Sequence, residues 1–303
     1  MNNSPFTRKL SRRSLLLGSA ALGAAYGVSR RAIAQPPAAV DTQRRSLQGI
    51  AFHLTTVDLS QPETLVTLGL ANDAPQANTP QRSYGDEPFP QIVRRMQAAV
   101  VANGTFFNTA APHRDVMGNM VGAGRLLRYF AWETRGTTLS LRQNQQPEMI
   151  TPNLENRPRA WGEYWFSLTC GPRLVTAGQV SVTAESVRAE GFTTGHLVNP
   201  QAAAGRSAIG FSQDGRTLLM VAFIDAVSLR RAAEILRELG AYQAMNLDGG
   251  ASVALAARGT IVYPAGRNLT NVIAVYDART PAPPALQTAW TQFQQGQLRP
   301  QVP

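Results

Sequence analysis

Apolar and polar residues alternate with a period of two along several short segments, a pattern typical of half-buried β-strands. Residues 49–59 and 63–70 are the first two such segments, and a proline-containing turn separates them. Residues 98–104 form a continuous apolar run that ends in Asn-Gly, which predicts a strand buried on both faces. Further strands are predicted around 125–133, 137–143, 164–170, 179–187, 242–247 and 271–276.

Turn and helix signals complete the pattern. Asp214-Gly215 and Arg258-Gly259 each lie between two apolar runs, so each predicts a β-hairpin. Residues 227–240 have apolar positions at helical spacing, and a shorter helix is predicted at 90–97, with a proline in its first turn. This order predicts an α+β fold with a mixed, largely antiparallel sheet core, one long helix and one or more short helices.

The N-terminal 34 residues have the composition of a signal peptide. Arg12-Arg13 precedes a short apolar stretch that ends at Ala32-Ile33-Ala34, and the twin arginine indicates the Tat export route. The apolar stretch is too short to predict a membrane span. We therefore expect transient contact with the Tat machinery, cleavage after Ala34, no stable membrane span after processing, and a periplasmic or extracellular protein.

The rest of the chain is expected to hold one domain. Residues 35–46 read as a linker, residues 47–279 as the domain, and residues 280–303 as a mobile tail rich in proline and glutamine. The formal charge of +10 gives little support for nucleic-acid binding. Six basic residues and no acid lie in the signal segment, so the remaining charge is 23 minus 19, or +4, and it is dispersed.

Cysteine and histidine usage restricts the chemistry. Cys170 is the single cysteine, so an intramolecular disulfide is excluded, and its apolar surroundings predict a buried core thiol. Three histidines occur, none at the spacing of a zinc site. No cofactor is required by any motif, while a divalent cation near Asp248 stays open.

Two glycine-containing strand ends carry the candidate chemistry. Asn103-Gly104 is followed by two phenylalanines, and Phe107 could offer an aromatic face to a sugar. In the segment MNLDGGAS, Asn246 and Asp248 share one face of an extended chain, and the amides of two glycines could receive a phosphate. The residues alone leave both segments open between a plain turn and a binding loop.

Two further charged residues adjoin predicted strands. Asp225 follows the apolar strand that ends near 224 and precedes the helix, so it is either a helix cap or a site carboxylate. Arg206 precedes the strand SAIGF, and arginine suits bidentate recognition of phosphate.

The ordered set of motifs NGTFFN, CGPRLV, RSAIGFSQDGRTLLMVAFID and MNLDGGAS resembles the phosphodiester glycosidase family. The resemblance covers roughly residues 48–277. It implies a site that includes these residues: Asn103, Arg206, Asn246, Asp248, Gly249, Gly250 and Ser252, with Asp225 nearby. Three departures from the family pattern are Thr105 and Ala251, each in place of a glycine, and a shortened loop after Asp225.

The resemblance implies a hydrolase that cleaves a bond between a sugar and a phosphate, with a carbohydrate or sugar phosphate as its substrate, and the signal segment implies that this enzyme is exported. Arg206 and the Gly249 and Gly250 amides would bind the phosphate, and Asp248 would stabilise the sugar cation or activate water, with Asp225 as a second carboxylate. The alternatives are a glycan-binding envelope protein without activity, and an enzyme of envelope polysaccharide or teichoic-type phosphodiesters.

Overall fold

A computed structural model describes residues 38–131, 133–155, 159–193 and 195–303. The predicted signal peptide, residues 1–34, lies outside these described residues. The described chain forms three β-sheets and four α-helices, and every strand pairing assigned within the sheets is antiparallel. The predicted α+β class and its largely antiparallel sheets are therefore confirmed.

Sheet I has seven strands. In spatial order they are β1 (Val40–Leu47), β2 (Ile50–Asp58), β13 (Thr217–Phe223), β12 (Ser207–Phe211), β14 (Gln243–Asn246), β10 (Arg173–Thr176) and β11 (Gln179–Val180). Because β12 pairs antiparallel with both β13 and β14, the C-terminal ends of β13 and β14 lie at the same edge of the sheet, on either side of Ser207.

Sheets II and III have five strands each. Sheet II contains β16 (Thr260–Tyr263), β15 (Leu255–Ala257), β4 (Val100–Asn103), β17 (Asn271–Tyr276) and β3 (Leu65–Leu70). Sheet III contains β6 (Arg125–Arg128), β5 (Met120–Gly122), β9 (Tyr164–Cys170), β7 (Thr137–Arg142) and β8 (Pro147–Ile150). One apolar cluster draws side chains from all three sheets, so their facing surfaces form a shared core.

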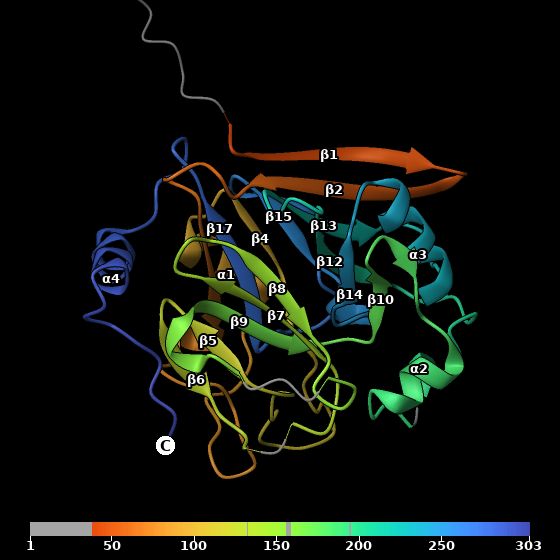
Figure 1. The fold of residues 1–303 in the computed structure, drawn as a ribbon, viewed down its shortest axis with the longest axis horizontal. Coiled ribbons are helices and arrows are strands. Elements are labelled where there is room, and N and C mark those ends of the chain that lie inside the picture. Colours follow the sequence, from red (N-terminus) through yellow and green to blue (C-terminus); the bar gives the residue numbers. More distant parts are fainter. Residues whose placement is uncertain (1–37, 132, 156–158, 194) are drawn as a thin grey trace, which may run out of the picture. The chain divides into compact units, whose positions relative to one another are not determined.

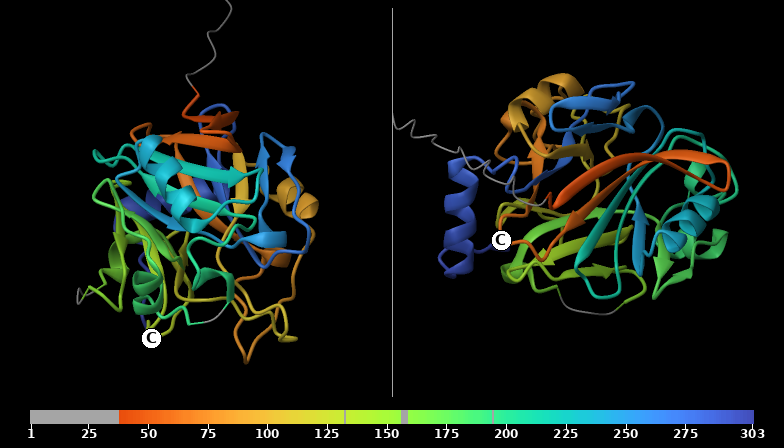
Figure 2. Two further views of the ribbon diagram at one scale, coloured as in Figure 1. Left: turned by 90° about the vertical axis from the view of Figure 1, so that its right-hand side faces the viewer. Right: turned by 90° about the horizontal axis from the view of Figure 1, so that it is seen from above.

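The helices cover the outer faces of the sheets. Helix α3 (Leu229–Glu238) packs with α2 (Ala184–Ala189) on sheet I, and α1 (Phe89–Met96) packs on sheet II. Ser228 caps α3 by accepting a hydrogen bond from the Arg231 amide at 3.1 Å. Figure 2 shows α3 lying across the strands of sheet I.

Several segments differ from their predicted structure. Residues 40–46, expected in a linker, belong to β1, because the backbone of this polar segment pairs with β2 over its whole length. Residues 184–187, expected in a strand, begin α2, since Thr183 and Ser186 form a capping box. The expected mobile tail contains helix α4 (Pro284–Gln294), which buries Phe293 against Trp165 of β9.

Candidate functional site

The segment MNLDGGAS carries the chain from sheet I to sheet II. Asn246 ends β14 in sheet I, a single helical turn follows at Gly250–Ser252, and β15 then pairs with β4 and β16 in sheet II. The flanking strands therefore belong to different sheets, and the segment is not a hairpin turn. Asp248 lies in this crossing, beside the end of β4.

Asn103, the last residue of β4, holds the crossing in place. Its side-chain amide nitrogen donates to the Asp248 carbonyl at 2.8 Å and to the Ser207 hydroxyl at 3.0 Å, and its oxygen accepts from the Ala254 amide at 3.1 Å. The side chain is buried. We expected Asn103 to contact substrate, but the structure gives its amide to the backbone around Asp248.

The next two residues are fixed by Asn271 of β17. The Gly104 carbonyl accepts from the Asp248 amide at 3.1 Å, and a Cβ atom at Gly104 would lie 2.0 Å from the Asn271 side-chain oxygen. That same oxygen accepts from the Thr105 amide at 2.8 Å, and the Thr105 hydroxyl donates to the Thr169 carbonyl. Thr105, where the family pattern has glycine, is thus buried and hydrogen-bonded, and Asn271 is a supporting residue that the sequence did not reveal.

Asp248 is the acid of the crossing, and its ionisation is strongly perturbed. Burial raises the pKa of its carboxyl to about 6, while Ser252, the positive charge of Arg267 and the Gly249 amide lower it in part. The Gly249 amide donates to the carboxylate at 2.9 Å. The buried Ser252 hydroxyl lies close enough to affect this pKa, yet no hydrogen bond of ordinary geometry joins the two. A carboxylate with a raised pKa beside an exposed cation is typical of catalytic sites.

The glycine amides expected to bind phosphate are already engaged. The Gly249 amide donates to Asp248, and the Gly250 amide donates to the Gly205 carbonyl at 2.9 Å. Gly250 has a positive φ of 58°, which closes the turn that places these bonds. In this structure the two glycines shape the loop around Asp248 and present neither amide to a ligand.

Arg206 is also turned into the protein. Its side chain donates to the carbonyls of Val227 and Ala202, each at 3.4 Å, and it is buried. Burial lowers the pKa of its guanidinium to about 10, so the group remains a cation at neutral pH. Arg206 lines neither of the two cavities described below, and its expected role in binding phosphate stays a prediction.

Asp225 lies at the same edge of sheet I as Asp248 but faces another strand. Its carboxylate accepts from the Ala51 amide of β2 at 2.7 Å, and the residue is exposed. Because β2 borders β13 on the side opposite to β12 and β14, this contact turns Asp225 away from Asp248. The structure therefore does not bring the two expected carboxylates together.

Asn246 supports the start of the crossing, at the end of β14. Its side-chain amide donates to the Gly171 carbonyl at 3.1 Å and to the Leu247 carbonyl at 2.6 Å, while its buried oxygen has no hydrogen-bond partner among the described residues. Glu190 holds the turn that links β9 to β10 at Gly171 by accepting a hydrogen bond from the Arg173 amide. Burial raises the pKa of Glu190 to about 7. Cys170, next to this turn, is fully buried, which confirms the predicted core thiol.

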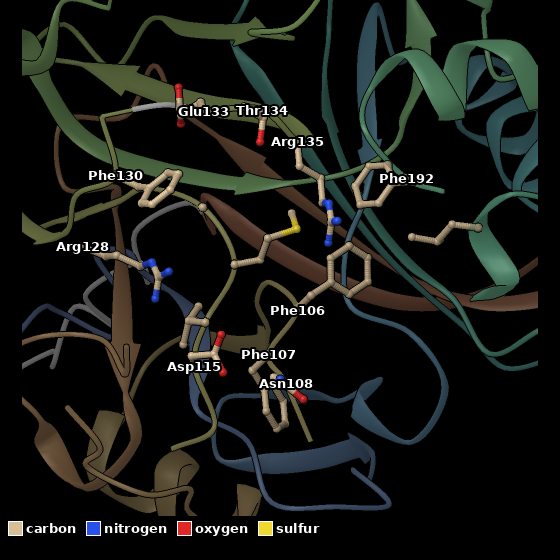
Figure 3. A pocket seen from close by; sticks show the side chains of 14 residues that line it. Phe106, Phe107, Asn108, Asp115, Arg128, Phe130, Glu133, Thr134, Arg135 and Phe192 are labelled. Atoms are coloured by element: carbon tan, nitrogen blue, oxygen red, sulfur yellow. The ribbon is translucent and has the colours of Figure 1, made fainter. Parts of the chain in front are cut away.

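A cavity of about 520 Å³ opens beside the NGTFFN motif, and we call it the Phe pocket. Figure 3 shows Phe106 and Phe192 on one side, Phe130 and Arg128 on the other, and Arg135 reaching in beside Phe106. Phe106 and Phe192 meet edge to face at 6.1 Å. Such a volume is within the range of small-molecule sites, roughly 300–1,000 Å³.

A second cavity adjoins the first at Phe107, which lines both. Its other walls include Arg267, Arg114 and Asp86. Arg114 is paired with Asp86 at 3.2 Å, whereas Arg267 is exposed and forms no ion pair with another described residue. Arg267, which the sequence did not single out, is therefore an unpaired cation of this cavity, and its charge lowers the pKa of Asp248.

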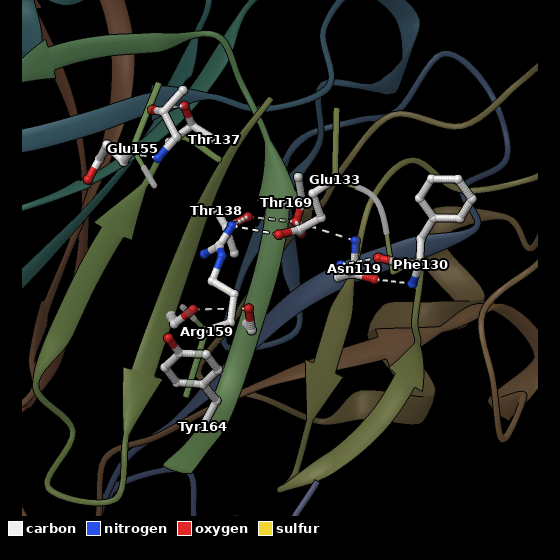
Figure 4. Close-up of polar contacts among 12 residues, drawn as sticks. Asn119, Phe130, Glu133, Thr137, Thr138, Glu155, Arg159, Tyr164 and Thr169 are labelled. Carbon is white, nitrogen blue, oxygen red and sulfur yellow. Dashed lines mark hydrogen bonds and ion pairs between the residues drawn. The ribbon is translucent and has the colours of Figure 1, made fainter. Parts of the chain in front are cut away.

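A network on sheet III fixes the far wall of the Phe pocket (Figure 4). Glu133 accepts from Arg159 at 2.8 Å and from the Thr169 hydroxyl at 3.2 Å, and both members of the ion pair are nearly buried. Asn119 binds the backbone of Phe130 through both ends of its amide. These contacts hold Phe130 at the rim, where 53% of its surface is exposed.

Two features are absent from the residues that the structure describes. No three His, Cys, Asp or Glu side chains there gather in a way that could hold a metal ion. No helix in the described part of the chain has the length and apolar character needed to cross a membrane.

The sequence profile of the phosphodiester glycosidase family matches residues 96–276. This range contains the strand ends, the crossing and both cavity-lining segments described above, apart from Asp86. No curated protein matches the chain by sequence.

Solved structures share the fold at low identity. The catalytic domain of zebrafish N-acetylglucosamine-1-phosphodiester alpha-N-acetylglucosaminidase, auto-inhibited by its pro-peptide, is 18% identical over 78% of this chain and 82% of its own, with a TM-score of 0.60. A hypothetical protein from Synechocystis is 19% identical over 78% and 62%, with a TM-score of 0.53. A protein from Burkholderia pseudomallei, described as exported, is 14% identical over 76% and 75%, with a TM-score of 0.53.

Proposed function

The chain belongs to the phosphodiester glycosidase family, and from that premise we propose that it hydrolyses the bond between a sugar and a phosphodiester. The substrate is a carbohydrate of the bacterial envelope or the extracellular space. This location rests on the twin-arginine signal segment and is supported by the likeness to an exported protein. The Tat machinery is its transient partner during export.

The observation that carries the proposal is the environment of Asp248. Its backbone is held on both sides, by Gly104 at the amide and by Asn103 and Ser207 at the carbonyl. Its carboxyl has a pKa raised to about 6 by burial, so it is ionised at neutral pH yet basic enough to accept a proton. A carboxylate fixed and tuned in this way suits attack on a sugar.

Arg267 takes the role that the sequence suggested for Arg206. Its exposed guanidinium stands beside the second cavity, and its charge acts on Asp248. A planar guanidinium binds two phosphate oxygens at once. We place the scissile phosphate at Arg267 and the sugar over Phe107, between the two cavities.

In the reaction, the oxygen of a water molecule forms a bond to the anomeric carbon while the bond from that carbon to the phosphate oxygen breaks. Asp248 accepts a proton from the water and later returns it to solvent. The bonding electrons leave with the phosphate, giving a free sugar and a phosphomonoester. A phosphate is a weak base, so it leaves without a second carboxylate, which agrees with the position of Asp225.

Hydrolysis in ¹⁸O-labelled water tests this assignment. Purified protein is incubated with N-acetylglucosamine-1-(methyl phosphate), and the products are analysed by mass spectrometry. We expect the label in the sugar, because the carbon–oxygen bond is the one that breaks, and a release by Asp248→Asn that is about 10²–10³ slower. Label in the phosphate would identify a phosphodiesterase instead, and binding without any release would indicate a glycan-binding protein.

A further inference from the structure

We infer that the Phe pocket binds a second, anionic part of the substrate, and that the natural substrate is an oligomer whose sugar units carry phosphodiester or carboxylate groups. This inference rests on the proposed function, because it starts from a sugar phosphate bound at Asp248 and Arg267. It adds a second recognition site, on the other side of Phe107, with Arg135 as its anion-binding residue.

Arg135 is placed to bind an anion. Its Nε donates to the Gly191 carbonyl at 3.1 Å, which fixes the side chain and leaves both terminal nitrogens without a partner among the described residues. The residue is exposed, and Figure 3 shows its guanidinium extending into the pocket beside Phe106 and Phe192. A fixed guanidinium with free terminal nitrogens is suited to two oxygens of one phosphate or carboxylate.

No acid that lines the two cavities forms an ion pair with Arg135 or Arg267 among the described residues. Glu133 is paired with Arg159, and Asp86 is paired with Arg114. Asp115 and Arg128 both line the Phe pocket. Burial lowers the pKa of Arg128, and the negative charge of Asp115 offsets part of this decrease. Arg135 and Arg267 are thus left as two separate positive sites, one in each cavity.

The surface between these positive sites suits a sugar. Phe106 and Phe107 follow Asn103-Gly104-Thr105 along the chain, and Phe107 borders both cavities. Phe130 adds an exposed aromatic side chain at the rim. Aromatic faces pack against the C–H surfaces of sugar rings, while the anionic groups at either end meet an arginine. The arrangement therefore fits a chain of alternating sugars and anions better than one terminal sugar.

A binding experiment in the Asp248→Asn background tests the inference without turnover. Three probes extend N-acetylglucosamine-1-(methyl phosphate) by one further hexose on the sugar: a neutral hexose, a hexose bearing a methyl phosphodiester, and a hexuronic acid. Affinities are measured by titration calorimetry at low and high salt. The neutral probe controls for size, and the two acidic probes distinguish a phosphodiester from a carboxylate.

We expect at least one acidic probe to bind about tenfold more tightly than the neutral probe, with the preference shrinking as salt increases. Arg135→Gln should abolish the preference, and Arg135→Lys should retain part of it. Arg125→Gln removes an exposed arginine of β6 that lines neither cavity, and it should keep the full preference.

Equal affinity for all three probes would overturn the inference, as would a preference that survives Arg135→Gln. The proposed function fails in a different way, because absence of sugar release by the unaltered protein leaves these affinities measurable. The two ideas are therefore tested by separate readouts.

Discussion

Asp225 and Asp248 occupy equivalent places in sheet I but have opposite surroundings. Each follows a strand, β13 or β14, and both strands end at the same edge. Asp225 is exposed and caps the Ala51 amide of β2. Asp248 is largely enclosed by the crossing to sheet II, with a pKa raised to about 6. The strand end is common to both, so the element that faces each carboxylate decides what it can do.

The difference also shows why one acid suffices for the proposed chemistry. Asp225 is tied to the backbone of its own sheet, whereas Asp248 lies in the crossing that joins sheet I to sheet II. Our proposal therefore places the reacting carboxylate at the junction between sheets I and II. The predictions below test that contrast, beginning with the largest expected effect.

Replacing each acid by its amide should separate the two in activity. Asp248→Asn should lower kcat for release of sugar by about 10²–10³, the usual cost of losing a group that acts in the transition state. Asp225→Asn should stay within about twofold, because its amide oxygen can still accept from Ala51. Steady-state kinetics on one sugar-1-phosphodiester measures both, and equal losses would remove the distinction.

Gly104→Ala should disrupt the support of Asp248. The added Cβ would lie 2.0 Å from the Asn271 side-chain oxygen, so the Asn271 side chain must move and give up its hydrogen bonds to Thr105. We expect a loss of about 3 kcal/mol in the free energy of unfolding, measured by denaturant titration. Gly162→Ala is the matched control, since nothing lies within 4 Å of a Cβ there. A stable Gly104→Ala protein would show that this contact is not required.

Asn103→Ala should cost about 2 kcal/mol, because it leaves the Ala254 amide and the Asp248 carbonyl with fewer partners in the core. Asn108→Ala, at the exposed end of the same motif, should cost less than 1 kcal/mol. Thermal and denaturant unfolding give both values. If the two substitutions lower the free energy of unfolding by the same amount, the hydrogen bonds of Asn103 do not stabilise the crossing as its contacts indicate.

The raised pKa of Asp248 predicts how stability depends on pH. The folded protein binds this proton more tightly than the unfolded chain, so stability from Asp248 is full below about pH 4 and is lost as pH rises through about 6. Asp248→Asn should therefore be more stable than the unaltered protein at pH 8 by about 1–3 kcal/mol, with the gain vanishing near pH 4.

Comparing the two proteins at each pH removes the contribution of Glu190, which titrates in both with a pKa of about 7. The rate of hydrolysis should show the opposite dependence on pH from the stability. It should decrease as the pH drops through about 6, because Asp248 is then protonated. A gain in stability that does not change with pH would mean that the effect of Asp248→Asn is not one of ionisation.

The smallest effect is expected at Asp225. Asp225→Ala removes one exposed hydrogen bond to the start of β2 and should cost about 1 kcal/mol or less in unfolding free energy. Asp225→Asn should restore most of that loss. A larger cost, or a change in the pH dependence of hydrolysis, would bring Asp225 back into the site.

The sequence predicted the elements that local signals determine. Ser228 and the apolar spacing after it specify α3, and Asp214-Gly215 specifies the β12–β13 hairpin. Strand β1 escaped prediction because it is a polar edge strand, stabilised by pairing with β2 and carrying little apolar pattern of its own. The capping box at Thr183 is a local signal that could have revealed α2.

The position of the site was predictable from the sequence, but the hydrogen-bond partners of its residues were not. The motifs located Asp248 and the β4 end, yet the partners of Arg206 and of the Gly249 and Gly250 amides depend on residues distant in the sequence or on the loop's own closure. Arg267 is a lone exposed arginine in a turn, so nothing in the sequence distinguishes it. Its importance follows only from the fold that places it beside Asp248.

Helix α4 bears on how the protein should be trimmed for further study. The family profile ends at residue 276, but Trp290 and Phe293 of α4 pack on Trp165 with ring centres 4.8 and 5.5 Å away. A polypeptide shortened to the family limits would lose this cover and present a tryptophan of sheet III to water. The segment that the family profile matches is therefore smaller than the unit that packs together. Expression of this protein should extend through Arg299, whose side chain lies 4.5 Å over the Phe293 ring.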